Sequence, residues 1–292
     1  MSGDPFVTHR SLLFTVAYEM LGSGADAEDV VQETWLRWAS IGDAARNEVR
    51  DPRGYLLRIV TRQALNRLRS VSRRREEYVG EWLPEPLLTS PDIADDVELA
   101  ESVSIAMLTV LETLGPDERA VFVLREVFDV PYDEIAEAVG KSVTAVRQIA
   151  HRARGHVAAR RPRMAVSRTE QQQVVERFLA ALTTGDLQGL MDVLAPDVVL
   201  VADGGGLAPA ARRPVEGSER VAAFLSRVAQ FAPGAQIATL LLNGAVAAWI
   251  DPAGELNTAV TFVFEAGRIS RIYAIRNPHK LGRLEQVAEL SR

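Results

Sequence analysis

The sequence predicts a multidomain protein in which two all-α domains, the second a helix-turn-helix, precede an α+β domain. Its 292 residues suit two domains, or three small ones. Apolar residues recur at helical spacing as far as Arg161, and short β-rich runs appear after Thr169. The last unit, about 110 residues long, is large enough for its own core. The expected parts are a first helical domain, an acidic connector, a second helical domain and the α+β domain, residues 1–75, 76–101, 102–163 and 169–281.

Three helices are expected in the first domain. Phe6–Leu21 is one apolar-periodic segment, which ends at a glycine-rich turn. Asp26 is expected to cap the second helix, Ala27–Ala39. A loop over Ser40–Asp51 then leads to a third helix, which Pro52 opens because proline is favoured in the first helical turn.

The connector and the second domain follow. The segment Trp82-Leu-Pro-Glu-Pro86 makes the connector stiff, because proline restricts the backbone. Helical periodicity then returns. From Pro131 a short amphipathic helix, a tight turn at Gly140 and a second helix capped by Ser142 form the helix-turn-helix. A shorter linker, residues 162–168, leads to the α+β domain.

The α+β domain is expected to start with helices and continue with strands. Its helices are Glu170–Thr183, Leu187–Leu194 and one near Ser218–Gln230. Its strands are the apolar and β-branched runs Val198–Ala202, Ile237–Leu242, Val246–Ile250, Leu256–Glu265 and Ile269–Ile275.

The charges lie in blocks, although the net charge is only −6. Residues 46–75 hold ten Arg against two acids, and residues 76–101 hold nine acids and no base. Residues 141–163 hold seven Lys or Arg and no acid. Blocks of this strength indicate two nucleic-acid faces joined by an acidic connector.

The composition excludes several classes of protein. The absence of cysteine rules out a disulfide framework, a thiolate zinc site and a cysteine nucleophile. Asp4, His9 and Arg10 interrupt any early apolar run, so no signal peptide is expected. No stretch is long and apolar enough to span a membrane. We therefore expect a soluble cytoplasmic protein, not an enzyme, with no metal, cofactor or membrane partner.

The third helix has an apolar stripe and a basic stripe. The apolar stripe consists of Leu57, Val60, Ala64, Leu68 and Val71. The opposite stripe consists of Arg58, Arg62, Asn66, Arg69 and Arg73. A merely solvated face normally mixes charges, whereas this helix carries no acid, which favours contact with DNA phosphates.

Tyr55, and less clearly Trp35 and Trp38, offer flat surfaces for unpaired bases. Core packing is the alternative for each aromatic, and it is the expectation for Trp35.

The second helix of the helix-turn-helix has a similar division. Its buried stripe is Val146, Ile149, Ala150, Ala153 and Val157. The side chains predicted to face DNA are Thr144, Arg147, Gln148, His151 and the flanking Arg152 and Arg154. Arg reads guanine and Gln reads adenine in the major groove, while flanking arginines hold phosphates. An ordinary helical hairpin is the alternative, but the acid-free second helix favours DNA binding.

Three segments resemble the bacterial RNA polymerase sigma factors. The segment Asp26-Ala-Glu-Asp-Val-Val-Gln-Glu-Thr-Trp-Leu-Arg-Trp38 resembles the one that grips the clamp helices of the polymerase. Pro52-Arg-Gly-Tyr-Leu-Leu-Arg-Ile-Val-Thr-Arg-Gln-Ala-Leu-Asn-Arg-Leu-Arg resembles the −10 recognition and melting segment, and residues 105–161 resemble the −35 reader. The long central domains of primary sigma factors have no equivalent, so the chain is similar to an extracytoplasmic-function sigma factor.

The resemblance implies partners and contact residues. The partners are core RNA polymerase, through its β′ clamp helices and β flap, and promoter DNA. The implied polymerase contacts are Asp26, Glu28, Asp29, Gln32, Glu33 and Arg37. The implied −10 contacts are Arg53, Tyr55 and the basic stripe, and the −35 contacts are the DNA-facing side chains of the second domain. Helix capping is the alternative for Asp26, but it does not explain Gln32 and Glu33 one turn later.

The C-terminal part resembles the SnoaL-like domain, with its NTF2-like cone fold, that is fused to one sigma subgroup. The resemblance lies in Trp82-Leu-Pro-Glu-Pro86, Asp203-Gly-Gly-Gly206 and Asn277-Pro-His-Lys-Leu281. In that subgroup Lys usually follows the glycines, whereas Leu207 stands here. The fold hosts both enzymes and binders, so it gives no function. The titratable candidates for an acid–base pair are Asp192, Asp203 and His279, and no spacing joins them.

We expect this domain to regulate in cis. The expected contacts between the connector and the domain are Trp82, Pro84, Pro86, Asp203, Gly204, Gly205, Gly206, Asn277 and Lys280. They would set the spacing of the two DNA-binding domains; a plain loop between strand and helix is the alternative for the glycines. The chain as a whole is expected to be an alternative sigma factor. A ligand-sensing transcription regulator whose C-terminal pocket binds or converts an unknown small molecule remains the second hypothesis.

Overall fold

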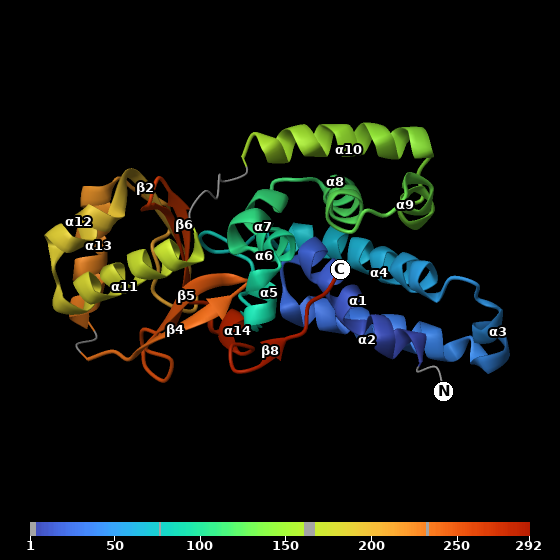
Figure 1. Cartoon of the computed structure of the whole chain (residues 1–292), viewed down its shortest axis with the longest axis horizontal. Coiled ribbons are helices and arrows are strands. Elements are labelled where there is room, and N and C mark those ends of the chain that lie inside the picture. Colours follow the sequence, from blue (N-terminus) through green and yellow to red (C-terminus); the bar gives the residue numbers. More distant parts are fainter. Residues whose placement is uncertain (1–3, 76, 161–166, 232–233) are drawn as a thin grey trace.

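The computed structural model describes residues 4–75, 77–160, 167–231 and 234–292, without the side chains at positions 43, 72–75 and 231. Two helical domains lie side by side, and an α/β domain lies at one end of them (Figure 1). The predicted order of two all-α domains and an α+β domain is confirmed.

The first helical domain packs its long helices around one apolar core. Its helices are α1 (Pro5–Leu21), α2 (Gly24–Ser40), α3 (Gly42–Glu48) and α4 (Pro52–Arg75). The expected loop over Ser40–Asp51 is wrong, because most of it forms α3. Gly42 takes a positive φ of 72° and breaks the chain direction, and Ala44 and Ala45 after it are strong helix formers.

The cap of α2 differs from the prediction. Ser23 is the N-cap, and its Oγ accepts a hydrogen bond of 3.2 Å from the Asp26 backbone N–H. Asp26 therefore lies in the first turn, and its carboxylate is available to Arg67. Ser and Asp are comparable caps, and Ser23 takes the role here because its Oγ reaches the first-turn amide three positions later.

The second helical domain contains the predicted helix-turn-helix. Gly140 ends α9 in the left-handed conformation, with φ of 70°, and Ser142 caps α10. All five residues of the predicted apolar stripe of α10 are buried, which confirms that stripe. The elements of this domain are α7 (Ile105–Leu111), α8 (Pro116–Phe122), the π-helical turn η1 (Val123–Val127), α9 (Tyr132–Val139) and α10 (Val143–Ala158).

The acidic connector is not a plain spacer, because its residues 83–87 are buried. Leu83 and Leu87 are each 1% exposed, and Leu88 pairs with Leu242 of the C-terminal sheet. The connector forms β1 (Leu88–Thr89), α5 (Pro91–Asp95) and α6 (Val97–Val103). The count of charges did not predict this burial, because the buried surface comes from the leucines between the acids.

The C-terminal domain is built on one mixed sheet with strand order β3-β2-β7-β6-β5-β4-β1-β8. Helices α11, α12 and α13 contribute to the core on one face. The strands are β2 (Leu194–Asp203), β3 (Val215–Glu216), β4 (Ile237–Leu242), β5 (Ala245–Ile250), β6 (Thr258–Glu265), β7 (Arg268–Ile275) and β8 (Val287–Ala288). The helices are α11 (Arg168–Thr184), α12 (Leu187–Val193), α13 (Ser218–Phe231) and α14 (Pro278–Leu281).

The opposite face of this sheet is also covered. Ala247, Ala259 and Tyr273 pack there against Leu83 of the connector and Ile105 of α7. Residues of β6 are consequently buried along nearly its whole length. The sheet thus joins the C-terminal domain to both the connector and the second helical domain through one apolar cluster.

The end of the chain returns to the first helical domain (Figure 1). Strand β8 pairs in parallel with β1, and Leu290 is buried in the helical core. The backbone N–H of Ser291 donates to Thr15 Oγ1 at 3.0 Å. Residues beyond 281, which the predicted domain left out, therefore help to hold the three parts together.

A buried carboxyl lies where α1, α6 and α8 meet. Glu19 is fully buried; its Oε1 accepts a hydrogen bond of 2.8 Å from Ser102, and its Oε2 has no partner among the described residues. Arg119 donates to the Glu19 backbone carbonyl and pairs with Glu112. Burial raises the pKa of Glu19 to about 8, against the hydrogen bond from Ser102 and the charge of Arg119.

We predict that this carboxyl makes stability fall as pH rises. A carboxyl with a raised folded-state pKa holds a proton that the unfolded chain releases. Its stabilisation is full below pH 4.5 and is lost toward pH 8. The free energy of unfolding of Glu19→Gln, relative to that of wild type, should therefore rise by roughly 3 kcal/mol from pH 5 to pH 8. Thermal unfolding of both proteins at the two pH values measures this gain.

The exposed Glu176→Gln serves as the control and should track wild type at both pH values. A constant offset between Glu19→Gln and wild type would show that Glu19 does not titrate in this range.

Candidate nucleic-acid interface

The DNA-facing side of α10 is open to solvent. Arg147, Gln148 and His151 are exposed, as are the other predicted −35 residues Thr144, Arg152 and Arg154. Arg152 lies 3.6 Å from Glu118, and Arg154 lies 3.8 Å from Glu126. These are loose surface pairs of small energy, so phosphates can replace them.

Arg147 has a different neighbour. Its guanidinium lies 5.7 Å from the ring centroid of Tyr132 on α9, and this contact restrains the end of the side chain. A restrained arginine loses less entropy on binding, which suits a group that reads a base.

The basic stripe of α4 faces the second helical domain instead. Arg62 donates to the Glu137 carbonyl at 2.9 Å, and Arg58 lies 3.6 Å from the Glu137 carboxylate. Arg69 pairs with Asp117 of α8 at 2.8 Å. Three predicted −10 arginines are thus occupied by α8 and α9 in this arrangement.

Asp117 is the main acidic partner at this contact. It also accepts Lys141 from the helix-turn-helix turn at 2.9 Å. Burial opposes ionisation of Asp117, but the hydrogen bonds from Lys141 and Arg69 outweigh it and lower the pKa. Asp117 and Glu137 were not predicted as site residues, because the basic blocks by themselves do not show which acids face them.

The remaining predicted −10 residues are distributed around this contact. Arg53 and Asn66 are exposed, and the side chain of Arg73 lies outside the described residues. Tyr55 is half-buried, with its ring 5.8 Å from that of Trp38.

The expectation that Trp35 packs in the core is wrong. Trp35 is 37% exposed, and its ring lies 5.0 Å from Phe6. Trp38 is 1% exposed and donates its Nε1–H to Asp4 at 3.0 Å. Trp38 continues the buried stripe of Val31 and Thr34, so it offers no ring to a base in this conformation.

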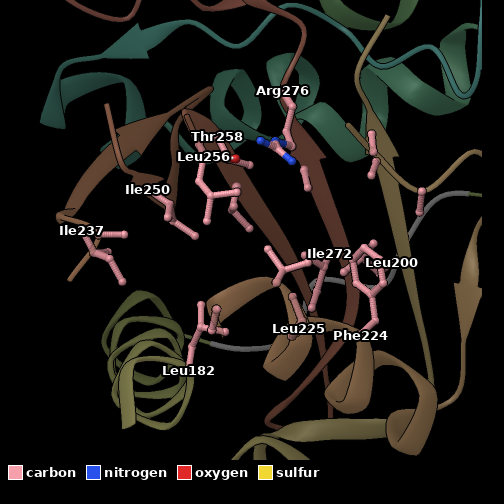
Figure 2. A pocket seen from close by; sticks show the side chains of 18 of the residues that line it. Leu182, Leu200, Phe224, Leu225, Ile237, Ile250, Leu256, Thr258, Ile272 and Arg276 are labelled. Atoms are coloured by element: carbon pink, nitrogen blue, oxygen red, sulfur yellow. Dashed lines mark hydrogen bonds between the residues drawn. The ribbon is translucent and has the colours of Figure 1, made fainter. Parts of the chain in front are cut away.

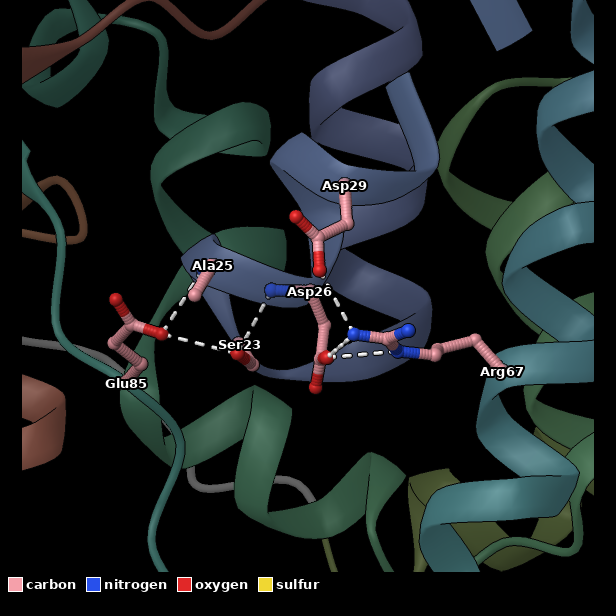
Figure 3. A network of polar contacts seen from close by, with 6 residues as sticks. All are labelled: Ser23, Ala25, Asp26, Asp29, Arg67 and Glu85. Atoms are coloured by element: carbon pink, nitrogen blue, oxygen red, sulfur yellow. Dashed lines mark hydrogen bonds and ion pairs between the residues drawn. The ribbon is translucent and has the colours of Figure 1, made fainter. Parts of the chain in front are cut away.

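The acidic side of α2 holds an ion-pair cluster (Figure 3). Arg67 donates to Asp26 at 2.8 and 2.6 Å and to Asp29 at 2.9 Å. These carboxylates raise the pKa of Arg67, chiefly through the hydrogen bond to Asp26. Since Ser23 caps the helix, the capping alternative does not explain the acid at position 26.

The other predicted polymerase contacts stay near the surface. Gln32 and Arg37 are exposed, and Glu33 accepts a hydrogen bond of 2.9 Å from Gln63. Glu28 pairs with Arg10 and lies 3.9 Å from Arg283. Arg283 comes from the end of the chain, so the C-terminal segment reaches this acidic side.

A buried ion pair joins the C-terminal domain to the connector. Asp203 is fully buried and accepts Lys280 Nζ at 2.7 Å, the Leu83 backbone N–H at 2.9 Å and the Tyr78 hydroxyl at 2.6 Å. Lys280 also donates to the Leu83 carbonyl and lies 4.0 Å from the Trp82 ring centroid. Residues separated by more than 100 positions thus share one desolvated network.

Tyr78 is the member of this network that sequence reasoning missed. Its hydroxyl accepts a hydrogen bond of 2.7 Å from Asn277 while it donates to Asp203. Burial and then the hydrogen bond to Asp203 raise the pKa of Tyr78. The only sequence signal was an aromatic four residues before Trp82 in an acidic stretch.

The glycines after Asp203 allow neighbouring side chains to approach the backbone closely. A Cβ at Gly205, where φ is 60°, would collide with Asn277, and one at Gly206 would lie 3.2 Å from Val79. Leu207, where the related subgroup usually has Lys, is 59% exposed. The buried ion pair at this place is made by Lys280.

The next residues of the connector are held by the first helical domain. Pro84 and Pro86 are buried. The Glu85 carboxylate between them accepts Ser23 Oγ at 3.0 Å and the Ala25 N–H at 3.2 Å, at the start of α2 (Figure 3). A helix N-terminus favours a carboxylate, although burial raises the pKa of Glu85.

Asn243, between β4 and β5, makes a second set of contacts between the domains. It accepts the Leu87 N–H at 2.9 Å and donates to Tyr18 of α1 and to the Val103 carbonyl. One buried amide therefore touches the first helical domain, the connector and the sheet.

The α/β domain encloses an apolar cavity of about 160 Å³ (Figure 2). Asp192, Asp203 and His279 do not line it, and Arg276 is the one titratable residue in its described lining. An acid–base pair for enzyme chemistry is therefore missing from the described walls. In the described part of the chain, His, Asp and Glu nowhere gather as a metal site. Among the same residues, no helix is long and apolar enough to cross a membrane.

The fold and the exposed basic helix define a DNA-binding transcription protein with a cone domain. Family models match sigma-70 region 2 over residues 6–74, sigma-70 region 4 over residues 104–157 and a SnoaL-like domain over residues 175–272. The chain is 39% identical to the ECF RNA polymerase sigma factor SigJ of Mycobacterium tuberculosis, across 96% of this chain and 93% of that protein. It is 34% identical to the probable ECF sigma factor SigI of the same species, across 94% and 92%.

A solved structure supports the same assignment. The crystal structure of the M. tuberculosis extracytoplasmic function sigma factor SigJ superposes with a TM-score of 0.76 at 36% identity, covering 94% of this chain and 96% of that one. The chain therefore belongs to the extracytoplasmic-function RNA polymerase sigma factors that carry a C-terminal SnoaL-like domain.

We predict that Lys280→Met releases the connector. It leaves the Asp203 carboxylate buried without its cation, a change that typically costs about 3–5 kcal/mol. Amide hydrogen exchange of residues 78–87 should become faster. The double variant Asp203→Asn with Lys280→Met removes both charges and should recover most of the protection. Equal exchange in wild type and Lys280→Met would show that the ion pair does not hold the connector.

Proposed function

We propose that this chain is an alternative sigma factor that binds core RNA polymerase and directs it to −35/−10 promoter DNA, with its C-terminal domain modulating that activity in cis. The observation that carries the proposal is the open basic face of α10 on a chain whose three family segments occur in the sigma order. The polymerase, not this chain, performs the chemistry.

Helix α10 is the −35 reader in this proposal. Thr144, Arg147, Gln148 and His151 meet base edges in the major groove, and Arg152 and Arg154 hold phosphates. The second helical domain would contact the β flap of the polymerase.

Helix α4 is the −10 element. Arg58, Arg62, Arg69 and the exposed Arg53 and Asn66 would hold the backbone while the duplex opens. Each base that leaves the stack costs a few kcal/mol. Tyr55 would stack on a released base and offset part of that cost.

The acidic side of α2 is the polymerase contact. Asp29, Gln32 and Glu33 would meet basic and polar groups of the β′ clamp helices, together with Asp26, Glu28 and Arg37. The ion pairs to Arg67 lie partly in solvent, so a basic partner surface can compete for these carboxylates.

The described arrangement is a closed state in this proposal. Arg58, Arg62 and Arg69 contact α8 and α9, so the −10 face cannot hold DNA until the helical domains separate. The connector that joins those domains is held by Asp203 and Lys280 on one side and by α2 on the other. The C-terminal domain thereby fixes the separation of the two DNA-binding helices.

The alternative class, a ligand-sensing regulator, is separated by one experiment. A run-off transcription assay with core enzyme, with and without this protein, should give specific transcripts only when the protein is present. A conventional regulator would bind its operator alone, usually as a symmetric dimer, and would start no transcription with core enzyme.

Truncation is a poor test of the cis role when it cuts inside the sheet. An end after Ser270 would remove most of β7, which pairs with both β2 and β6. An end after residue 163 removes the whole domain and leaves Leu83 and Leu88 without the sheet residues that cover them. Lys280→Met leaves every strand of the sheet in the chain. A promoter activity that differs from that of wild type in this variant would support regulation in cis.

We predict that Arg147→Ala weakens −35 binding by about 1–3 kcal/mol, because it removes a base contact. Fluorescence anisotropy on promoter and on scrambled duplexes, at fixed salt, measures the change. Arg160→Ala, which removes an exposed arginine just after α10, is the control for the loss of one positive charge. An equal loss on every sequence would demote Arg147 to a phosphate contact.

We predict that neutralising Arg58, Arg62 and Arg69 together abolishes promoter opening while polymerase binding survives. The reason is that phosphate contacts on α4 are lost, whereas α2 is untouched. Permanganate footprinting measures opening, and co-elution with core enzyme measures binding.

The acidic partner gives the matching test. Glu137→Ala frees Arg58 and should increase opening, whereas Asp133→Ala on the same helix should not. Unchanged opening in the triple arginine variant would remove α4 from the −10 assignment.

A further inference from the structure

The cavity of the α/β domain is apolar along most of its wall. It lies between the sheet and helices α11 and α13. Figure 2 shows the labelled aliphatic and aromatic side chains around it, with Arg276 at one end near Thr258 and Leu256. The principal apolar walls are Leu182, Leu200, Phe224, Leu225, Ile250 and Ile272.

Arg276 brings one positive charge to this apolar space. Its terminal nitrogens donate to the backbone carbonyls of Pro209 and Glu255. Its Nε is buried and has no hydrogen-bond partner among the described residues. Burial alone lowers the pKa of Arg276, with no carboxylate of the described chain opposing the shift. A guanidinium held only by carbonyls keeps its full charge uncompensated.

These two features select a ligand. A cavity of about 150 Å³ lined by aliphatic and aromatic groups accommodates a benzene-sized body. One unpaired guanidinium favours a single anion, and a planar carboxylate matches its geometry best. The walls offer little to sugars or to multiply charged phosphates, and they repel cations.

We propose that this cavity binds a small apolar monocarboxylate, with its ring or short chain among the leucines and its carboxylate on Arg276. The ligand would be bound rather than converted, because the described walls supply no acid–base pair. The site is distinct from the Asp203–Lys280 contact with the connector.

The two sites share backbone. The N–H groups of Arg276 and Asn277 both donate to the Asp203 carbonyl, at 2.7 and 3.0 Å. Ala202 and Pro209, on the two sides of the glycine turn, also line the cavity. A carboxylate bound to Arg276 would therefore shift the backbone that positions Asp203 and Asn277. Because these two residues contact the connector, the connector would shift with them. This consequence rests on the proposed function, whereas ligand binding does not.

Isothermal titration calorimetry of the full chain tests the binding. The probes are phenylacetate, its neutral analogue phenylacetamide and acetate. Phenylacetate should bind one to one and about 10- to 100-fold more tightly than phenylacetamide, since one charge-assisted contact separates them. Acetate should not bind measurably, because it lacks the apolar body. Equal affinity for phenylacetate and phenylacetamide would overturn the proposal.

Three variants locate the site. Arg276→Met should remove the preference for the anion, and Ala274→Leu, which fills the cavity, should remove binding of both aromatic probes. Arg271→Gln, an exposed arginine of the same strand, should leave binding unchanged. Phenylacetate binding that survives both cavity variants would place the ligand elsewhere and overturn the assignment.

Hydrogen exchange reads the coupling without polymerase. Saturating phenylacetate should change the exchange of residues 78–87 in wild type and not in Ala274→Leu. Binding with no change in these amides would overturn the coupling, and it would leave the transcription assay as the separate test of the proposed function.

Discussion

The arrangement of this protein depends on how its connector is held between domains. Asp203 and Lys280 bury a charge pair against Leu83, and Glu85, two residues on, binds the start of α2. A buried pair contributes little net stability by itself, but a partner lost from it is costly. The pair therefore favours this position of the connector, because moving Leu83 away would take a hydrogen-bond partner from both Asp203 and Lys280.

The two basic helices differ because of that constraint. With the connector fixed, α8 and α9 lie against α4: Glu137 and Asp117 pair with Arg58 and Arg69, and the Glu137 backbone carbonyl accepts a hydrogen bond from Arg62. Helix α10 lies on the outer side and stays exposed. The contact between the helical domains combines these surface pairs with one apolar core that spans both domains, and the connector adds a buried polar network. In the proposed closed state, partner surfaces would compete for the surface pairs, whereas the buried network would change through the C-terminal domain.

Features that depend on neighbouring residues could be predicted from the sequence. The Gly140 turn, the Ser142 cap and the apolar stripe of α10 follow from short-range rules, and so do most strands of the α/β domain. The family motifs likewise identified Trp82, Asp203, Asn277 and Lys280 before any contact was visible. Boundaries were less secure where two residues compete for one role, as Ser23 and Asp26 do, or where a short helix such as α3 lies in a polar stretch.

The sequence by itself determined which segments are helices or strands, where the basic and acidic blocks lie and which family the chain resembles, because these depend on residue type and short spacing. The tertiary structure alone decided that Trp38 rather than Trp35 is buried, that Tyr78 and Glu85 anchor the connector and that α4 is covered. It also decided that Arg276 faces an apolar cavity without a carboxylate. These pairings are long-range, and residue spacing within one chain does not show which distant residues will meet; the contact of the connector with Asp203, Asn277 and Lys280 was expected from the family resemblance.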